Sequence, residues 1–82
     1  NSTPLDNWQL FTKGVKEFNA AKTRDDYEWV VEIFDEVIRK AGFMSDASKY
    51  KGRCYIEMGI PHSALIAFKK AIENDEKNAE LY

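Results

Sequence analysis

The sequence predicts an all-α fold built from antiparallel helical hairpins. Apolar residues recur at steps of three or four along most of the chain, which is the spacing of one face of a helix. No stretch alternates apolar and polar residues with a period of two, and no run rich in valine, isoleucine and threonine is bounded by turn residues. Start and stop signals divide the helical pattern into four helices and a short C-terminal helical segment.

A first helix is expected over about residues 5–22. Thr3 is its candidate N-cap, and Pro4 suits the first turn because a backbone N–H would have no partner there. Asp6 favours the positive end of the helix dipole. Gly14 costs about 1 kcal/mol relative to alanine unless a neighbouring helix needs the space. The apolar residues that follow helical spacing are Trp8, Phe11, Val15, Phe18 and Ala21.

A second helix is expected to start after the N-cap Thr23 and to end before Gly42. Acidic residues in its first turn and the cations Arg39 and Lys40 in its last turn both agree with the helix dipole. Gly42 is the candidate for a left-handed cap after the last turn. The residues expected on the buried side of this helix are Tyr27, Val30, Val31, Phe34, Val37, Ile38 and Ala41.

Ser45 is the candidate N-cap of a third helix over about residues 46–58. Gly59 is expected to end this helix, because glycine readily adopts the left-handed conformation that closes many helices. Gly59 and Pro61 frame a tight turn, so the third and fourth helices are predicted to fold back on one another.

A fourth helix is expected to open at Pro61 and to end near Asn74. Asp75 is then the candidate cap of a short final segment over residues 77–82. The small and apolar residues along the fourth helix are Ala64, Leu65, Phe68, Ala71 and Ile72.

The second and fourth helices line up at a single offset of 34 residues. A fixed period of this size is typical of stacked supersecondary units, each of which cannot bury its apolar face alone. The matched core positions are Val30 with Ala64, Phe34 with Phe68, Val37 with Ala71, and Ile38 with Ile72.

The fullest pattern lies in residues 45–78, where small and large residues follow one another in the order Gly52, Tyr55, Gly59, Ala64, Phe68 and Ala71. This series resembles the signature of a tetratricopeptide repeat. Ser48 and Lys51 stand where that family usually has tryptophan and leucine, and Glu76 replaces its usual proline.

The resemblance extends over most of the chain as two repeats in one domain, 1–82. The first unit, about residues 5–44, fits if about three extra residues lie in 21–26, and residues 79–82 resemble the opening of a further helix. The resemblance implies antiparallel hairpins stacked as a short right-handed α-solenoid.

Composition excludes several classes of function. The net charge is −2 and the pI about 5.3, so no strongly basic face is expected for nucleic acid or for an anionic membrane surface. No apolar run approaches the roughly 18 residues of a membrane span. The single cysteine, Cys54, excludes an internal disulfide and fits a cytoplasmic location.

Chemistry-bearing residues are scarce, and no enzyme activity is predicted. The one histidine, His62, is expected to be a solvated residue in the first turn of the fourth helix, and Cys54 a packed thiol. No cysteine or histidine pair has metal-ligand spacing, and no glycine-rich loop could hold a phosphate. We therefore expect no catalytic residue, metal or cofactor.

The resemblance implies a concave groove, lined by the first helix of each unit, that binds an extended peptide or a helix of a partner protein. Lys49 and Arg53 are four residues apart, so they share a face and could bind an acidic group together. The implied groove residues are Asp46, Lys49, Arg53, Ile56 and Glu57 from the third helix, and Gln9, Thr12, Lys16 and Asn19 from the first.

Other interpretations remain open at this point. Two units are fewer than the roughly three that such stacks usually need, so the chain could be a piece of a longer scaffold, or an assembly element that forms homo-oligomers through its open C-terminal end. A clamp for the acidic tails of chaperones matches only in part, because Lys16 falls where those clamps have asparagine. The pair Trp8 and Phe11 suggests an RNA-processing helical repeat, but a broad basic surface is missing.

Overall fold

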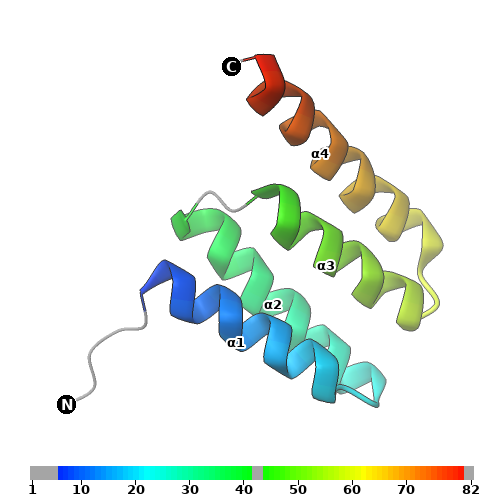
Figure 1. The fold of residues 1–82 in the computed structure, drawn as a ribbon. Helices are drawn as coiled ribbons and strands as arrows, with labels where there is room; N and C mark the ends of the chain where they lie inside the picture. The colour runs from blue at the N-terminus through cyan, green and yellow to red at the C-terminus, as the bar shows by residue number, and fades with distance from the viewer. Residues whose placement is uncertain (1–5, 42–43, 81–82) are drawn as a thin grey trace.

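The computed structural model describes residues 6–41 and 44–80, and these ranges contain four α-helices and no strand. The all-α prediction is confirmed. The helices lie side by side in chain order, with α4 at one edge (Figure 1). They form a slab of 38 × 37 × 17 Å, whose short dimension leaves room for only a thin core. Their bounds are Asn7–Ala20 for α1, Arg24–Ala41 for α2, Met44–Glu57 for α3 and Pro61–Glu80 for α4.

α1 begins two residues later than expected, and Asp6 is its N-cap rather than a first-turn residue. The Asp6 carboxylate accepts a hydrogen bond from the backbone N–H of Gln9 at 2.8 Å, and the Gln9 side chain accepts one from the N–H of Asp6 at 3.0 Å. This capping box satisfies two backbone donors reciprocally, which explains why the helix starts here. The predicted cap Thr3, with Pro4, lies outside the described residues.

α2 begins as predicted, after the N-cap Thr23. The backbone N–H of Asp26 donates to Thr23 Oγ1 at 3.2 Å, and Asp26 Oδ2 accepts from the backbone N–H groups of Thr23 and Lys22 at 3.0 and 2.9 Å. These hydrogen bonds, that from Lys22 first, hold the pKa of Asp26 below its ordinary value. The cap predicted at Gly42 falls outside the described residues.

The prediction that Ser45 caps α3 is wrong. α3 begins at Met44, and the Ser45 hydroxyl instead donates to the backbone carbonyl of Ala71 in α4 at 3.4 Å. The end of α3 agrees with the prediction, since Gly59 has a φ of +75°. The N–H of Gly59 donates to Ile56 and that of Ile60 to Tyr55, which is the Schellman pattern for closing a helix.

α4 is one continuous helix of 20 residues, so the predicted end near Asn74 and the separate final segment capped by Asp75 are wrong. After Pro61 the helix contains neither proline nor glycine, and Glu76 and Lys77 are good helix formers, so nothing interrupts the hydrogen bonding. Because α4 is longer than the 14-residue α3, its C-terminal turns extend past the start of α3 (Figure 1).

Each of the hairpins α1–α2 and α3–α4 brings a glycine of its first helix directly beneath a phenylalanine ring of its second. A Cβ atom on Gly14 of α1 would lie 2.7 Å from Cζ of Phe34 in α2. A Cβ atom on Gly52 of α3 would lie at the same distance from Cζ of Phe68 in α4. Neither position has space for a side chain, so close packing offsets the low helix propensity of glycine.

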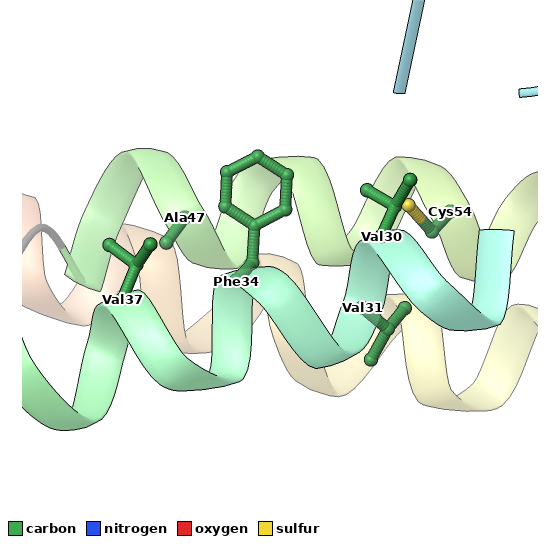
Figure 2. Close-up of a cluster of buried hydrophobic side chains, with 6 residues drawn as sticks. All are labelled: Val30, Val31, Phe34, Val37, Ala47 and Cys54. Atoms are coloured by element: carbon green, nitrogen blue, oxygen red, sulfur yellow. The ribbon is translucent and has the colours of Figure 1, made fainter. Parts of the chain in front are cut away.

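The best-buried part of the core lies between α2 and α3. The ring of Phe34 is fully buried and stacks on Tyr50 of α3, with centroids 5.0 Å apart. The cluster consists of Val30, Val31, Phe34, Val37, Ala47 and Cys54 (Figure 2). In contrast, Ile72, a matched core position in the sequence pattern, is 57% exposed, because no helix in the described ranges packs on that flank of α4.

Candidate binding surface on α1 and α3

Aromatic rings join α1 and α3 beside the core. Phe11 and Phe18 of α1 meet the ring of Tyr50 of α3 edge-on, with centroid distances of 6.1 and 5.4 Å. Tyr50 in turn stacks on Phe34 of α2. Edge-to-face and offset pairs of this kind add about 0.5–1.5 kcal/mol each beyond the area that they bury. The contact between α1 and α3 is therefore built from large, geometrically defined rings.

Arg53 lies over this aromatic contact. Its guanidinium carbon is 4.8 Å from the centroid of the Phe18 ring and 5.6 Å from that of Tyr50. The residue remains exposed to solvent. Cation–π attraction orients the planar guanidinium without using its N–H donors, which are directed from its edges. Arg53 is thus a pre-oriented cation at the junction of the two helices.

The other residues proposed on α3 surround Arg53 on the exposed side of the helix. Lys49 stands one turn before Arg53 and shares its face, as the spacing predicts. Ile56, which is 53% exposed, stands one turn after Arg53, so the cations adjoin an apolar side chain. Asp46 and Glu57 are also exposed. This surface combines positive charge, an apolar contact and carboxylates.

The residues proposed on α1 do not all meet this surface. Gln9, Thr12 and Lys16 line a shallow depression that α1 forms alone, together with Trp8, Lys13 and Glu17. Gln9 is engaged in the capping box, and the Thr12 hydroxyl donates to the carbonyl of Trp8 at 2.9 Å. Asn19 is exposed near the end of α1, outside the depression.

Phe18 is the α1 residue that meets Arg53, and sequence reasoning assigned it only to the core. Its helical spacing marks it as apolar and inward-facing, whereas the structure leaves it half-buried at the edge of the core. No signal in the sequence indicates this contact with Arg53, because it depends on how α1 packs against α3.

Cys54 and His62 lie apart from this surface. Cys54 is fully buried, as predicted, and burial raises the pKa of its thiol to about 12. It is therefore protonated and unreactive at neutral pH. His62 is exposed in the first turn of α4, also as predicted.

Other features of the described residues are limited. Among them no three histidine, cysteine, aspartate or glutamate side chains are grouped to hold a metal ion. None of the helices in the described part of the chain is long and apolar enough to span a bilayer. A cleft between α2 and α4 has α3 as its floor. Its volume of about 230 Å³ is below the usual size of small-molecule sites.

Comparison with known proteins does not assign the chain to a family. No family model, no curated protein and no solved structure matches it. The likeness to tetratricopeptide repeats therefore stays a prediction.

Proposed function

We propose that the chain is a protein-interaction module of stacked helical hairpins, which binds a peptide or helix of a partner protein on the surface formed by α1 and α3. The partner segment carries an acidic group. The observation that carries this proposal is the position of Arg53, held over Phe18 and Tyr50 at the junction of the two helices.

The packing of the two hairpins supports the repeat architecture. Gly14 lies under Phe34 and Gly52 under Phe68, in each case across a pair of antiparallel helices. Phe34 follows its glycine by 20 residues and Phe68 follows its own by 16, so the first hairpin holds four extra residues where about three were expected. The connections 21–23 and 58–60 are equally long, so the extra residues extend α1 and α2 rather than the loop.

The chemistry of the surface supports an acidic protein partner. Arginine presents five donors in a planar fork that matches a carboxylate, and a guanidinium already oriented by rings loses less freedom on binding. Lys49 adds a second positive charge on the same face, and Ile56 offers apolar area next to it. Aromatic residues and arginine are the types that most often dominate the energy of protein interfaces.

The proposal can be tested by selecting short peptides on the wild-type protein and comparing their affinity for variants. We expect the selected peptides to be rich in aspartate and glutamate, and to lose about tenfold in affinity with Arg53→Gln, the effect of an interface residue worth about 1.4 kcal/mol. The double variant Lys49→Glu with Arg53→Glu should abolish binding.

Arg24→Gln is the matched control, because Arg24 is an exposed arginine that pairs with Glu28 and belongs to α2 rather than to α1 or α3. Its affinity should equal that of the wild type. If the selected peptides bind Arg53→Gln as tightly as Arg24→Gln, the surface on α1 and α3 is not the binding site.

A further inference from the structure

α4 carries an exposed apolar stripe on the flank that faces away from α2. Leu65 and Ile72 are seven residues apart and therefore share one side of the helix. Both side chains are more than half exposed, at 55% and 57%. Phe68 lies between them, half-buried, with its ring edge against Gly52. We call Leu65, Phe68, Lys69 and Ile72 the α4 stripe. In the part of the chain that the structure describes, only α3 packs on α4, and it packs on the alanine side of the helix.

The corresponding flank of α2 is covered in part by α3. The residues 34 positions before the α4 stripe are Val31, Phe34, Asp35 and Ile38. Val31 is only 9% exposed, and the ring of Phe34 stacks on Tyr50 of α3. The Asp35 carboxylate forms an ion pair with Lys51 of α3 at 2.5 Å. Thus α3 packs against this flank of α2, whereas no helix in the described residues packs against the α4 stripe.

We propose that the α4 stripe docks an amphipathic helix of a partner protein, and that this helix carries a carboxylate where α3 carries Lys51. The basis is a reversal of charge between two positions that are 34 residues apart. On α2 this position is Asp35, which pairs with Lys51, whereas on α4 it is Lys69. A helix that covers Leu65 and Phe68 as α3 covers Val31 and Phe34 would place its own residue opposite Lys69, and an acidic residue complements that charge.

The charges also argue against a second copy of the chain as the occupant. Head-to-tail stacking would use α1 of the next copy as the covering helix. When α1 is aligned with α3 at Gly14 and Gly52, α1 carries Lys13 where α3 carries Lys51, so a lysine would face Lys69. A two-fold pairing of two α4 stripes would bring the two Lys69 ammonium groups together. Like charges in these positions disfavour both arrangements. The site is separate from Arg53, so it goes beyond the proposed function and its test is independent.

The probe that tests this inference is a synthetic copy of α3, residues 44–57, made helical by a staple between positions 49 and 53. Two versions are compared: one keeps Lys51 and the other carries Lys51→Glu. We expect the version with Lys51→Glu to bind the wild-type protein about two- to fivefold more tightly, which is the range for an exposed ion pair. In the protein variant Lys69→Asp the preference should reverse. The readouts are fluorescence anisotropy and NMR shifts of the α4 amides.

A matched pair of variants locates the site. Leu65→Ser with Ile72→Ser should abolish binding of the Lys51→Glu peptide and leave the melting temperature unchanged, since both side chains are already exposed. Ile66→Ser is the control, because Ile66 is 46% exposed but lines the cleft on the opposite flank of α4. The inference is overturned if the two peptide versions bind with equal affinity, or if the protein variant Lys69→Asp keeps the wild-type preference. It is also overturned if Ile66→Ser loses as much peptide affinity as the double variant. Concentration-dependent dimers that dissociate in the Leu65 and Ile72 double variant would replace the partner helix by a second copy.

Discussion

The hairpins α1–α2 and α3–α4 follow the same local packing rule but differ in what covers them. Both place a glycine of the first helix beneath a phenylalanine of the second, at the same contact distance. Phe34 is then fully buried, because α3 adds Tyr50 on the other side of its ring. Phe68 has no such second neighbour in the described residues and stays half-buried. The comparison shows that a hairpin sets the contact between its own helices, whereas the next helix decides how much of the outer flank is buried.

Truncation of the two phenylalanines should give the largest difference between the hairpins. Phe34→Ala removes a fully buried ring held between Gly14 and Tyr50, so we expect a loss of about 3–5 kcal/mol in the free energy of unfolding. Phe68→Ala should cost about half as much, because part of that ring is already in water. Urea unfolding measures both. Equal losses would mean that α3 adds little to the burial of Phe34.

Substitution of either glycine by alanine should lower the free energy of unfolding by a similar amount, which is smaller than the loss expected for Phe34→Ala. Gly14→Ala and Gly52→Ala each place a Cβ atom 2.7 Å from a ring, so the phenylalanine has to move. Overpacking of this kind costs about 1–3 kcal/mol, and the higher helix propensity of alanine returns up to about 1 kcal/mol. We expect both variants to be destabilised by a similar amount in the same unfolding assay. A clearly stabilised variant at either position would show that its hairpin is not closely packed there.

The ion pair between Asp35 and Lys51 should contribute less than 1 kcal/mol. It joins α2 to α3, but the Asp35 side chain is 54% exposed, and exposed pairs are screened by water and salt. A double-mutant cycle with Asp35→Asn and Lys51→Met should give a coupling within this range that decreases as salt is added. A coupling of several kcal/mol, or one insensitive to salt, would mean that the pair is effectively buried.

The smallest expected effect is the acid sensitivity of the α2 start. Backbone N–H groups of Lys22 and Thr23 lower the pKa of Asp26 from its ordinary value of 3.8. The stabilisation is therefore fully present above pH 3.8 and is lost as the pH falls through the lower folded-state pKa. Asp26→Asn should be less stable than the wild type at neutral pH, and the difference should shrink in acid. A difference that stays constant down to low pH would contradict the role of this carboxylate.

The start of α2 and the turn at Gly59 could be read from the sequence because their signals are local. Thr23 and Asp26 bond to backbone groups within four residues, and Gly59 supplies a positive φ by itself. The role of Ser45 could not be read in this way, since its hydroxyl bonds to Ala71, which is 26 residues away. The predicted end of α4 near Asn74 followed the tetratricopeptide pattern, in which a proline usually stands at this point. Here Glu76 takes the place of that proline and continues the helix.

The candidate surface was predictable in part. The spacing of Lys49 and Arg53 was enough to place them on one exposed face of α3. The sequence could not indicate that Arg53 rests on Phe18, because this contact depends on how α1 packs against α3. The exposure of Leu65 and Ile72 could not be predicted either, since the spacing of apolar residues indicates a helix face but not whether a neighbouring helix covers it.

The central claim, that α1 and α3 form the binding surface around Arg53, is tested most directly by NMR. A selected acidic peptide is titrated into isotope-labelled wild-type protein, and the shifts of backbone amides and aromatic rings are followed. The account predicts that the largest changes occur at Arg53, Tyr50 and Phe18. Changes confined to the cleft between α2 and α4, or to the α4 stripe, would contradict it.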